Sequence, residues 1–251
     1  EFFLLILVRI SGFMVSAPIF SLRNIPMRVK TILALAIAIL MFHVLPYREI
    51  AYETTIGYAA IVVSEMLAGV VLGFMANVSY YILAFAGQII DQEIGFSMVN
   101  QFDPITSAQV TVTGNLYTYA VMLMLFVTNM HQYLIRAITD SFTVLPVGEV
   151  VFHSEIYLVM KRFMVDYFVI GFRIVLPIFA SMLVVNSILA ILAKVAPQMS
   201  MFVIGLQLKV FVGLVVLVLM VMMITGVTDL IFREMMSMMR ETLPYLGGTG
   251  D

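Results

Sequence analysis

The sequence predicts an all-α, polytopic membrane protein built from long, kinked helical hairpins. The mean hydropathy of its 251 residues is +1.09, and only 11% of them are charged. Several apolar runs approach or exceed the ~20 residues that a helix needs to cross the hydrocarbon core of a bilayer. This combination excludes an ordinary water-soluble enzyme domain.

Six apolar segments are expected to form the helices. Pro26 and Pro46 flank the second segment, and each proline is expected to end the helical pattern. The third segment would extend roughly 50 Å as one straight helix at ~1.5 Å per residue, so it must tilt, kink near residues 73–77, protrude or fold into two arms. The expected segments are residues 2–20, 29–45, 56–90, 116–135, 165–193 and 199–227.

The charges of the loops disagree with a simple serpentine topology. The first loop contains Arg23, Arg28 and Lys30, which the positive-inside rule places in the cytoplasm. Strict alternation then puts the polar loop 91–114 on the same side, although it contains no Lys or Arg. Either the third segment crosses twice, or the chain is not a regular serpentine.

Residue patterns that support enzymatic or nucleic-acid chemistry are weak in this chain. The formal net charge is −2, and no long basic run marks a nucleic-acid surface. Cysteine is absent, and His43, His131 and His153 lack the spacing of metal ligands. No glycine-rich phosphate loop is present either. We therefore expect no catalytic residues, no metal and no cofactor.

Charged residues inside the apolar segments are expected to face protein or water, because charge in hydrocarbon is costly. Alternatively, Glu65 with Asp91 and Glu93 could form a proton relay. Transporters of that kind usually contain broken helices in two repeated halves, and no such repeat is visible here. The charges that need partners are Arg9, Glu65, Arg173, Lys194 and Lys209.

Small residues recur at four-residue spacing in the third segment. Gly69 and Gly73 form one stripe, and Ala60, Ser64 and Ala68 form another. Small side chains let helices approach closely where lipid provides no hydrophobic driving force. We expect Gly69 and Gly73 to mediate tight helix packing, with a neighbouring subunit as the partner.

Five stretches of the sequence form a highly specific combination that extends over nearly the whole chain. They are RISGFMVSAPIFSLRNIPMRVKTILALAIA (9–38), SEMLAGVVLGF (64–74), AGQIIDQEIGFSMVNQFDP (86–104), SFTVLPVG (141–148) and RIVLPIFASMLVVNSILAILAKVAPQMSMF (173–202). In this order, the stretches resemble the FliR/SctT family of type III secretion export-gate proteins.

The resemblance implies a single export-gate domain over residues 1–251 that joins a helical export-gate complex. It implies a pore-forming, non-enzymatic subunit that acts with FliP, FliQ and FlhB. Its expected place is the flagellar basal body in the bacterial inner membrane, where unfolded flagellar subunits are exported. The virulence counterpart SctT is one alternative, and a proton-coupled transporter is another.

The resemblance also implies that the loop of residues 95–114 plugs the pore. Glycine gives the backbone freedom at the start of the loop, and an Asp-Pro pair suits a reversal of the chain. Because the loop lacks cations, it would not bind acidic stretches of unfolded cargo. The residues assigned to the plug are Gly95, Phe96, Phe102, Asp103, Pro104 and Gly114.

Overall fold

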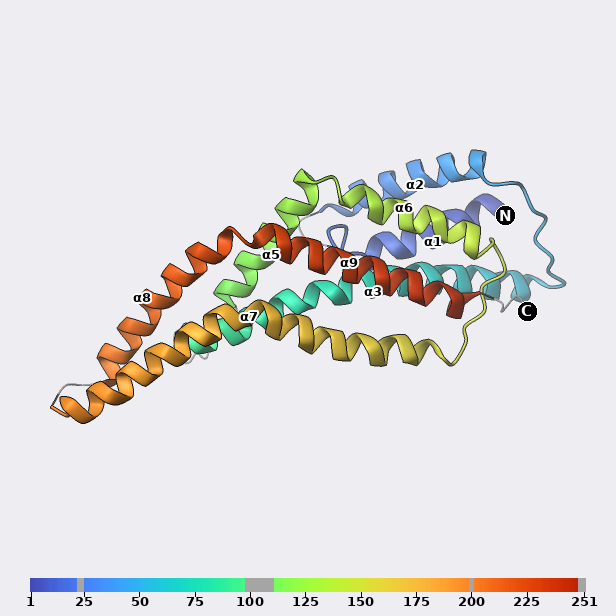
Figure 1. Cartoon of the computed structure of the whole chain (residues 1–251). Coiled ribbons are helices and arrows are strands. Elements are labelled where there is room, and N and C mark those ends of the chain that lie inside the picture. Colours follow the sequence, from blue (N-terminus) through green and yellow to red (C-terminus); the bar gives the residue numbers. More distant parts are fainter. Residues whose placement is uncertain (22–24, 98–110, 199–200, 248–251) are drawn as a thin grey trace. The chain divides into compact units, whose positions relative to one another are not determined.

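The computed structural model describes residues 1–21, 25–97, 111–198 and 201–247 (Figure 1). Apart from one isolated antiparallel bridge between Val150 and Gly247, the regular structure of these residues is helical, which confirms the all-α prediction. The elements are α1 (Phe2–Ser16), α2 (Met27–Val44), α3 (Thr55–Ile94), α5 (Val112–Val127), α6 (His131–Val144), α7 (Ile156–Val195), α8 (Met201–Val221), α9 (Ile224–Thr242) and the 3-10 turn η2 (Leu243–Leu246).

Local sequence explains several of the helix ends. Helix α1 stops at Ser16, just before Pro18, because the residue that precedes a proline is disfavoured in helical geometry. Gly95, with φ of +99°, follows the end of α3. Asn129, with φ of +58°, lies in the break between α5 and α6, where a left-handed conformation suits asparagine.

The structure differs from the expected segments in several places. Residues 116–135 are not one helix, because α5 and α6 are bent by 74° relative to each other. Helix α7 starts at Ile156, before the expected residue 165. The expected segments included only the first residues of α9. This helix is amphipathic rather than uniformly apolar, so its polar residues end the apolar run in the sequence.

Several helices are suited to a membrane. Among the described residues, α2, α3, α7 and the Val203–Val221 part of α8 are long and apolar enough to cross a bilayer, and the bent α5–α6 pair can count as a fifth span. Helices α3 and α7 have 40 residues each, or ~60 Å, against ~30 Å of hydrocarbon. These lengths confirm the prediction of a polytopic membrane protein with long helices.

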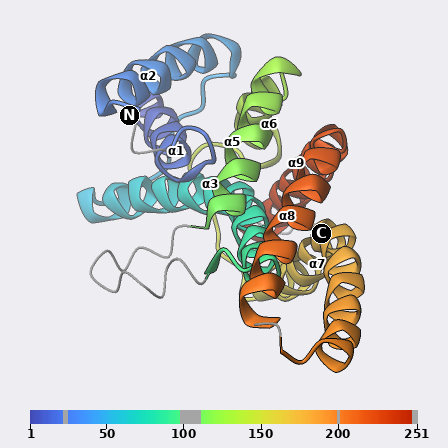
Figure 2. The same ribbon diagram turned by 90° about the vertical axis from the view of Figure 1, so that its left-hand side faces the viewer.

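The chain divides into two compact units, and α3 and α7 contribute residues to both. In the first unit, α2 lies beside α1 (Figures 1 and 2). In the second, the end of α7 and α8 form a hairpin in which Leu189 approaches Gly205 (Figure 2). The first unit comprises Glu1–Tyr80, Phe126–Val165 and Ile231–Asp251, and the second comprises Tyr81–Leu125 and Asp166–Leu230.

Helix α1 is a core helix of the first unit. It is an apolar helix of 15 residues within the described chain. Leu5, Ile6, Ile10 and Phe13 are all completely buried. The first expected segment therefore lies inside the protein, which agrees with the expectation that Arg9 faces protein or water rather than lipid.

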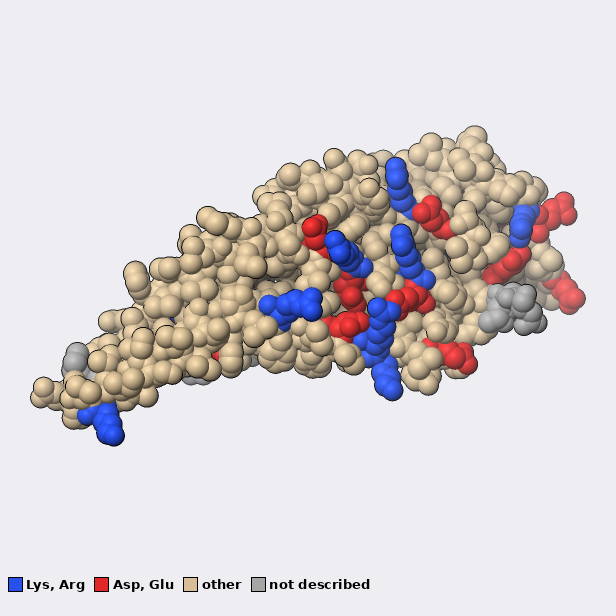
Figure 3. All heavy atoms as spheres, viewed as in Figure 1, with Lys and Arg blue, Asp and Glu red and all other residues tan. Residues whose placement is uncertain are grey.

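Charged side chains are unevenly distributed on the face shown in Figure 3. Lys, Arg, Asp and Glu gather over the first unit, whereas the α7–α8 hairpin of the second unit is almost free of charge except at its tip. An apolar hairpin with few charges is compatible with lipid or with the apolar surface of another protein.

Candidate functional site

The backbones of α1 and α3 touch where they cross in the first unit. A Cβ atom added at Gly73 would lie 2.8 Å from the carbonyl oxygen of Phe13, and one added at Gly69 would lie 3.0 Å from the Phe13 nitrogen. On the facing helix, a Cβ at Gly12 would lie 2.6 Å from the Met66 carbonyl oxygen. No side chain larger than glycine fits at these positions unless the helices separate.

The helix that packs on Gly69 and Gly73 is therefore α1 of the same chain. This corrects the expectation that a neighbouring subunit occupies the stripe. Small residues at four-residue spacing indicate that a helix comes close, but they carry no information on the chain to which that helix belongs.

A buried ion pair lies one helical turn further along the same crossing. Glu65 precedes Gly69 by four residues and so shares its face of α3, and Arg9 stands in the same relation to Phe13 on α1. Arg9 Nε donates to Glu65 Oε2 at 2.5 Å, and Nη2 donates to Oε1 at 2.9 Å. Both side chains are completely buried. This bidentate geometry is the strong form of the arginine–carboxylate contact.

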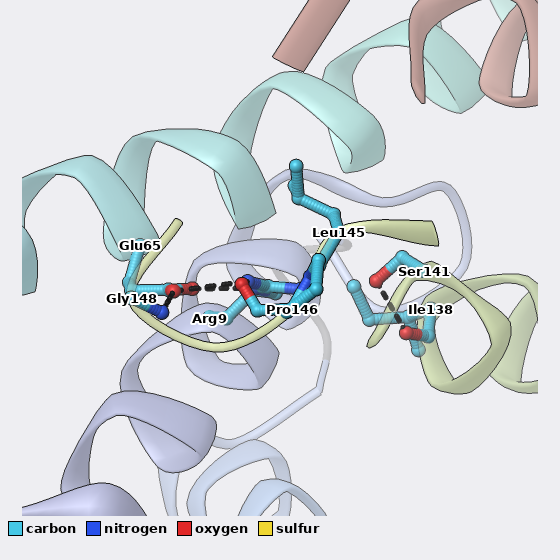
Figure 4. A network of polar contacts seen from close by, with 7 residues as sticks. All are labelled: Arg9, Glu65, Ile138, Ser141, Leu145, Pro146 and Gly148. Atoms are coloured by element: carbon cyan, nitrogen blue, oxygen red, sulfur yellow. Dashed lines mark hydrogen bonds and ion pairs between the residues drawn. The ribbon is translucent and has the colours of Figure 1, made fainter. Parts of the chain in front are cut away.

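The turn after α6 supplies the remaining partners of the pair, as Figure 4 shows. Arg9 Nη1 donates to the Leu145 carbonyl at 2.7 Å, and Nη2 reaches the Pro146 carbonyl at 3.4 Å. The Gly148 N–H donates to Glu65 Oε1 at 2.7 Å. Glycine suits this position because its φ is +89°. The network thus ties α1, α3 and the connection from α6 to α7 together.

This arrangement is that of a fixed clamp. Buried charges are tolerated when each is paired and its other hydrogen-bonding positions are filled, which is the case here. The Arg9 guanidinium also lies 4.4 Å from the centroid of the Phe142 ring, a cation–π contact. Because the Glu65 carboxylate is held by Arg9 and Gly148, it stabilises the crossing rather than presenting a free group to solvent.

Sequence reasoning named Arg9 and Glu65 separately and missed their pairing and the role of Gly148. The two charges are 56 residues apart, so spacing could not join them. A signal was nevertheless present, because Glu65 continues the glycine stripe of α3 by one turn. An acidic residue on the same helix face as closely packed glycines indicates that its partner lies on the helix that packs against that face.

In the second unit, the start of α5 is fixed to the end of α3. The Thr113 N–H donates to Asp91 Oδ1 at 3.1 Å, and the Thr113 hydroxyl donates to the same oxygen. A carboxylate at a helix N-terminus is favourable because it accepts from unpaired N–H groups. Next to it, a Cβ on Gly87 would lie 3.0 Å from the Thr113 carbonyl carbon and closer still to Gly114. The two backbones are therefore in contact.

This contact defines the base of the predicted plug loop. Gly95 follows α3 as predicted, and Phe96 is half-buried in the turn beside it. Gly114 lies inside α5 and not in the loop, which corrects the predicted boundary, because the Asp91 carboxylate caps a helix that starts at Val112. The other plug residues, Phe102, Asp103 and Pro104, lie outside the described residues.

Three other charges that were expected to need partners are not fully buried by the described part of the chain. Arg173 and Lys194 of α7 are exposed, and Lys209 of α8 is half-buried. Contacts of these three charges with protein stay a prediction for the assembled protein.

The titratable residues that could bind a metal are dispersed. Within the described ranges, no group of three or more His, Asp or Glu side chains has the geometry of a metal site. The His43 ring nitrogen is 2.7 Å from the Ile39 carbonyl, and His153 Nε2 is 2.8 Å from the Gly247 carbonyl. These two histidines thus contact backbone groups.

Comparison with known proteins identifies the family. The family described as bacterial export proteins, family 1, matches residues 1–235. The flagellar biosynthetic protein FliR of Bacillus subtilis (strain 168) is 33% identical over 250 residues, which cover 98% of this chain and 95% of that protein. FliR of Escherichia coli (strain K12) is 28% identical over 240 residues, with 96% and 92% covered. FliR of Aquifex aeolicus (strain VF5) is 26% identical over 220 residues, with 86% and 84% covered. The similarity extends over nearly the whole length and confirms the resemblance noted in the sequence, so the chain belongs to family 1 of the bacterial export proteins, the family of the flagellar biosynthetic protein FliR.

Proposed function

We propose that the chain is a structural, pore-forming subunit of the flagellar type III export gate. It acts with FliP, FliQ and FlhB, and unfolded flagellar subunits pass through the assembled gate across the bacterial inner membrane. The observation that carries the proposal is the family match over residues 1–235, together with relatives that are named as flagellar biosynthetic proteins.

The apolar surface of the chain supports a role in an assembly. Only 17% of the apolar window of α2 and 22% of that of α8 are buried within the chain. Ile32 of α2 and Val218 of α8 are each 67% exposed. Lipid or partner subunits must cover these faces, because long apolar helices are not stable in water. Uncovered spans are the surfaces on which FliP and FliQ would pack.

The interior of the chain supports a scaffold rather than a catalyst. The buried Arg9–Glu65 pair has all its strong contacts within the protein, and it lies at a crossing of helices. Such a pair fixes the register of α1 on α3, because any slip would separate buried charges. We propose that this rigidity keeps the chain in the shape that its neighbours require.

Co-expression of a tagged chain with FliP and FliQ tests the assembly. The complex is extracted in mild detergent and its mass is measured by native mass spectrometry. We expect a defined complex that contains all three proteins. A chain that remains a monodisperse monomer beside assembled FliP and FliQ would contradict the proposed function.

The plug belongs to the same proposal. The Asp91–Thr113 contact and the meeting of Gly87 with Gly114 bring the two ends of the connection between α3 and α5 together. A connection whose ends already meet can be shortened at little cost, since each doubling of loop length changes the closure free energy by only ~0.6 kcal/mol. We therefore propose that residues 98–110 can be shortened without loss of the α3–α5 contact and that they act as the plug.

Replacing residues 98–108 by a short Gly-Ser linker is expected to make the assembled gate leaky to ions while assembly persists. Conductance in planar bilayers measures the leak, and native mass spectrometry measures assembly. A Gly-Ser segment of the original length is the matched control for chain length, because it removes the side chains only. Unchanged conductance of a fully assembled, shortened gate would rule out the plug.

A further inference from the structure

An apolar pocket in the second unit contains a single charge. Its volume is 160 Å³, and its lining includes Arg173 and Pro177 of α7, Met220 of α8, and Gly226 and Leu230 of α9. Every lining residue except Arg173 is apolar. The pocket is therefore suited to an apolar ligand or side chain that also carries an anion.

Arg173 has no partner of its own within the described chain. No described residue forms an ion pair or a hydrogen bond with its guanidinium. Its neighbours on α7, Phe172 and Leu176, are 53% and 57% exposed. A cation on the apolar face of a membrane helix cannot remain against acyl chains without cost. A carboxylate on whatever covers this face would satisfy the guanidinium.

The backbone at the same level also needs a partner. Pro177 has no N–H, so the Arg173 carbonyl lacks the donor that an uninterrupted helix would place four residues later. The nearby Ser181 hydroxyl donates to the Pro177 carbonyl at 2.8 Å and not to that of Arg173. In membranes, neighbouring helices commonly satisfy such carbonyls.

Gly226 leaves the surface beside the pocket open. A Cβ added there would have no atom within 4 Å, in contrast to Gly69 and Gly73, whose space is filled by α1. Met223, one turn before it, is 59% exposed. An open glycine lets another helix backbone approach closely.

From these observations we infer that the face around Arg173 and Gly226 is the docking site for one apolar helix of a partner subunit, and that this helix carries an aspartate or glutamate opposite Arg173. The inference rests on the proposed function, which supplies the partner subunits. The carboxylate accepts from the guanidinium bidentately, and the partner backbone passes over Gly226.

A phospholipid fits the site less well than a helix, because the open surface at Gly226 allows the close approach of a helix backbone, which a lipid does not use.

The test uses the co-expressed complex with FliP and FliQ and three variants of the chain. Arg173→Glu is expected to lower recovery of the complex at least tenfold, because it places two carboxylates together. Arg173→Lys keeps the charge and is expected to retain most of the complex. Lys161→Glu, the same reversal at an exposed residue near the start of α7, is the matched control and is expected to assemble normally. The unfolding temperature of the Arg173→Glu chain alone should equal that of the wild type, because Arg173 is exposed.

Rescue identifies the partner residue. Each Asp or Glu within the apolar segments of FliP and FliQ is changed to Arg in turn, and one of these changes should restore assembly with Arg173→Glu. Normal assembly of Arg173→Glu would overturn the inference. Normal assembly together with loss of bound anionic phospholipid would overturn it too. Loss of assembly without any rescue would equally overturn it. Failure of the wild-type chain to assemble would instead contradict the proposed function.

Discussion

Replacing Glu65 by Leu is expected to destabilise the chain by ~3 to 5 kcal/mol, the usual cost of leaving one buried charge without its partner. The Arg9 guanidinium would stay inside the protein, where only the carbonyls of Leu145 and Pro146 remain to accept from it. Denaturant unfolding of the detergent-solubilised chain measures the loss.

The exposed pair of Arg48 and Glu149 is the matched control. Its side chains are 54% and 59% exposed, so Arg48→Met should change the stability by no more than ~1 kcal/mol. The double variant Arg9→Met/Glu65→Leu should recover part of the loss, but not all of it, because the Gly148 N–H remains unpaired. If Glu65→Leu were as mild as Arg48→Met, the clamp would not stabilise the fold.

Replacing Gly73 by Leu is expected to cost at least ~3 kcal/mol, the upper end for overpacking, because the clash is with backbone. A Cβ there already meets the Phe13 carbonyl oxygen and the Ala17 nitrogen at 2.8 Å. Helix α1 would have to move away from α3, and the unfolding temperature should fall accordingly.

Gly57 provides the control for this substitution. It lies in the same helix, and a Cβ there would meet the Thr54 hydroxyl oxygen at an ordinary 3.4 Å. Gly57→Leu should be neutral or slightly stabilising, since leucine is the better helix former by just under ~1 kcal/mol. Equal stability of the two variants would mean that the α1–α3 crossing is not tightly packed.

Composition and apolar runs were sufficient to predict the fold class, because a helix that crosses lipid must be long and almost uncharged. The same criterion missed the part of α9 beyond residue 227, whose polar face lowers its hydropathy although its other face is buried. It also merged α5 and α6, since the break at Asn129 depends on one positive φ that hydropathy does not report.

The sequence predicted individual residues of the candidate site but not how they pair. Single charges in apolar runs indicated that Arg9, Glu65 and Arg173 need partners. Whether the partner is in the same chain depends on tertiary packing, which paired Arg9 with Glu65 and left Arg173 exposed. The glycine stripe of α3 had the same ambiguity, and α1 resolved it.

The chain is expected to work only as part of an assembled gate. Planar-bilayer recordings on the purified chain alone and on its complex with FliP and FliQ, both with the shortened 98–108 segment, test it most directly. We expect no conductance and no proton-driven uptake from the chain alone, and ion conductance from the complex. Proton-coupled transport of a solute by the chain alone would contradict this account.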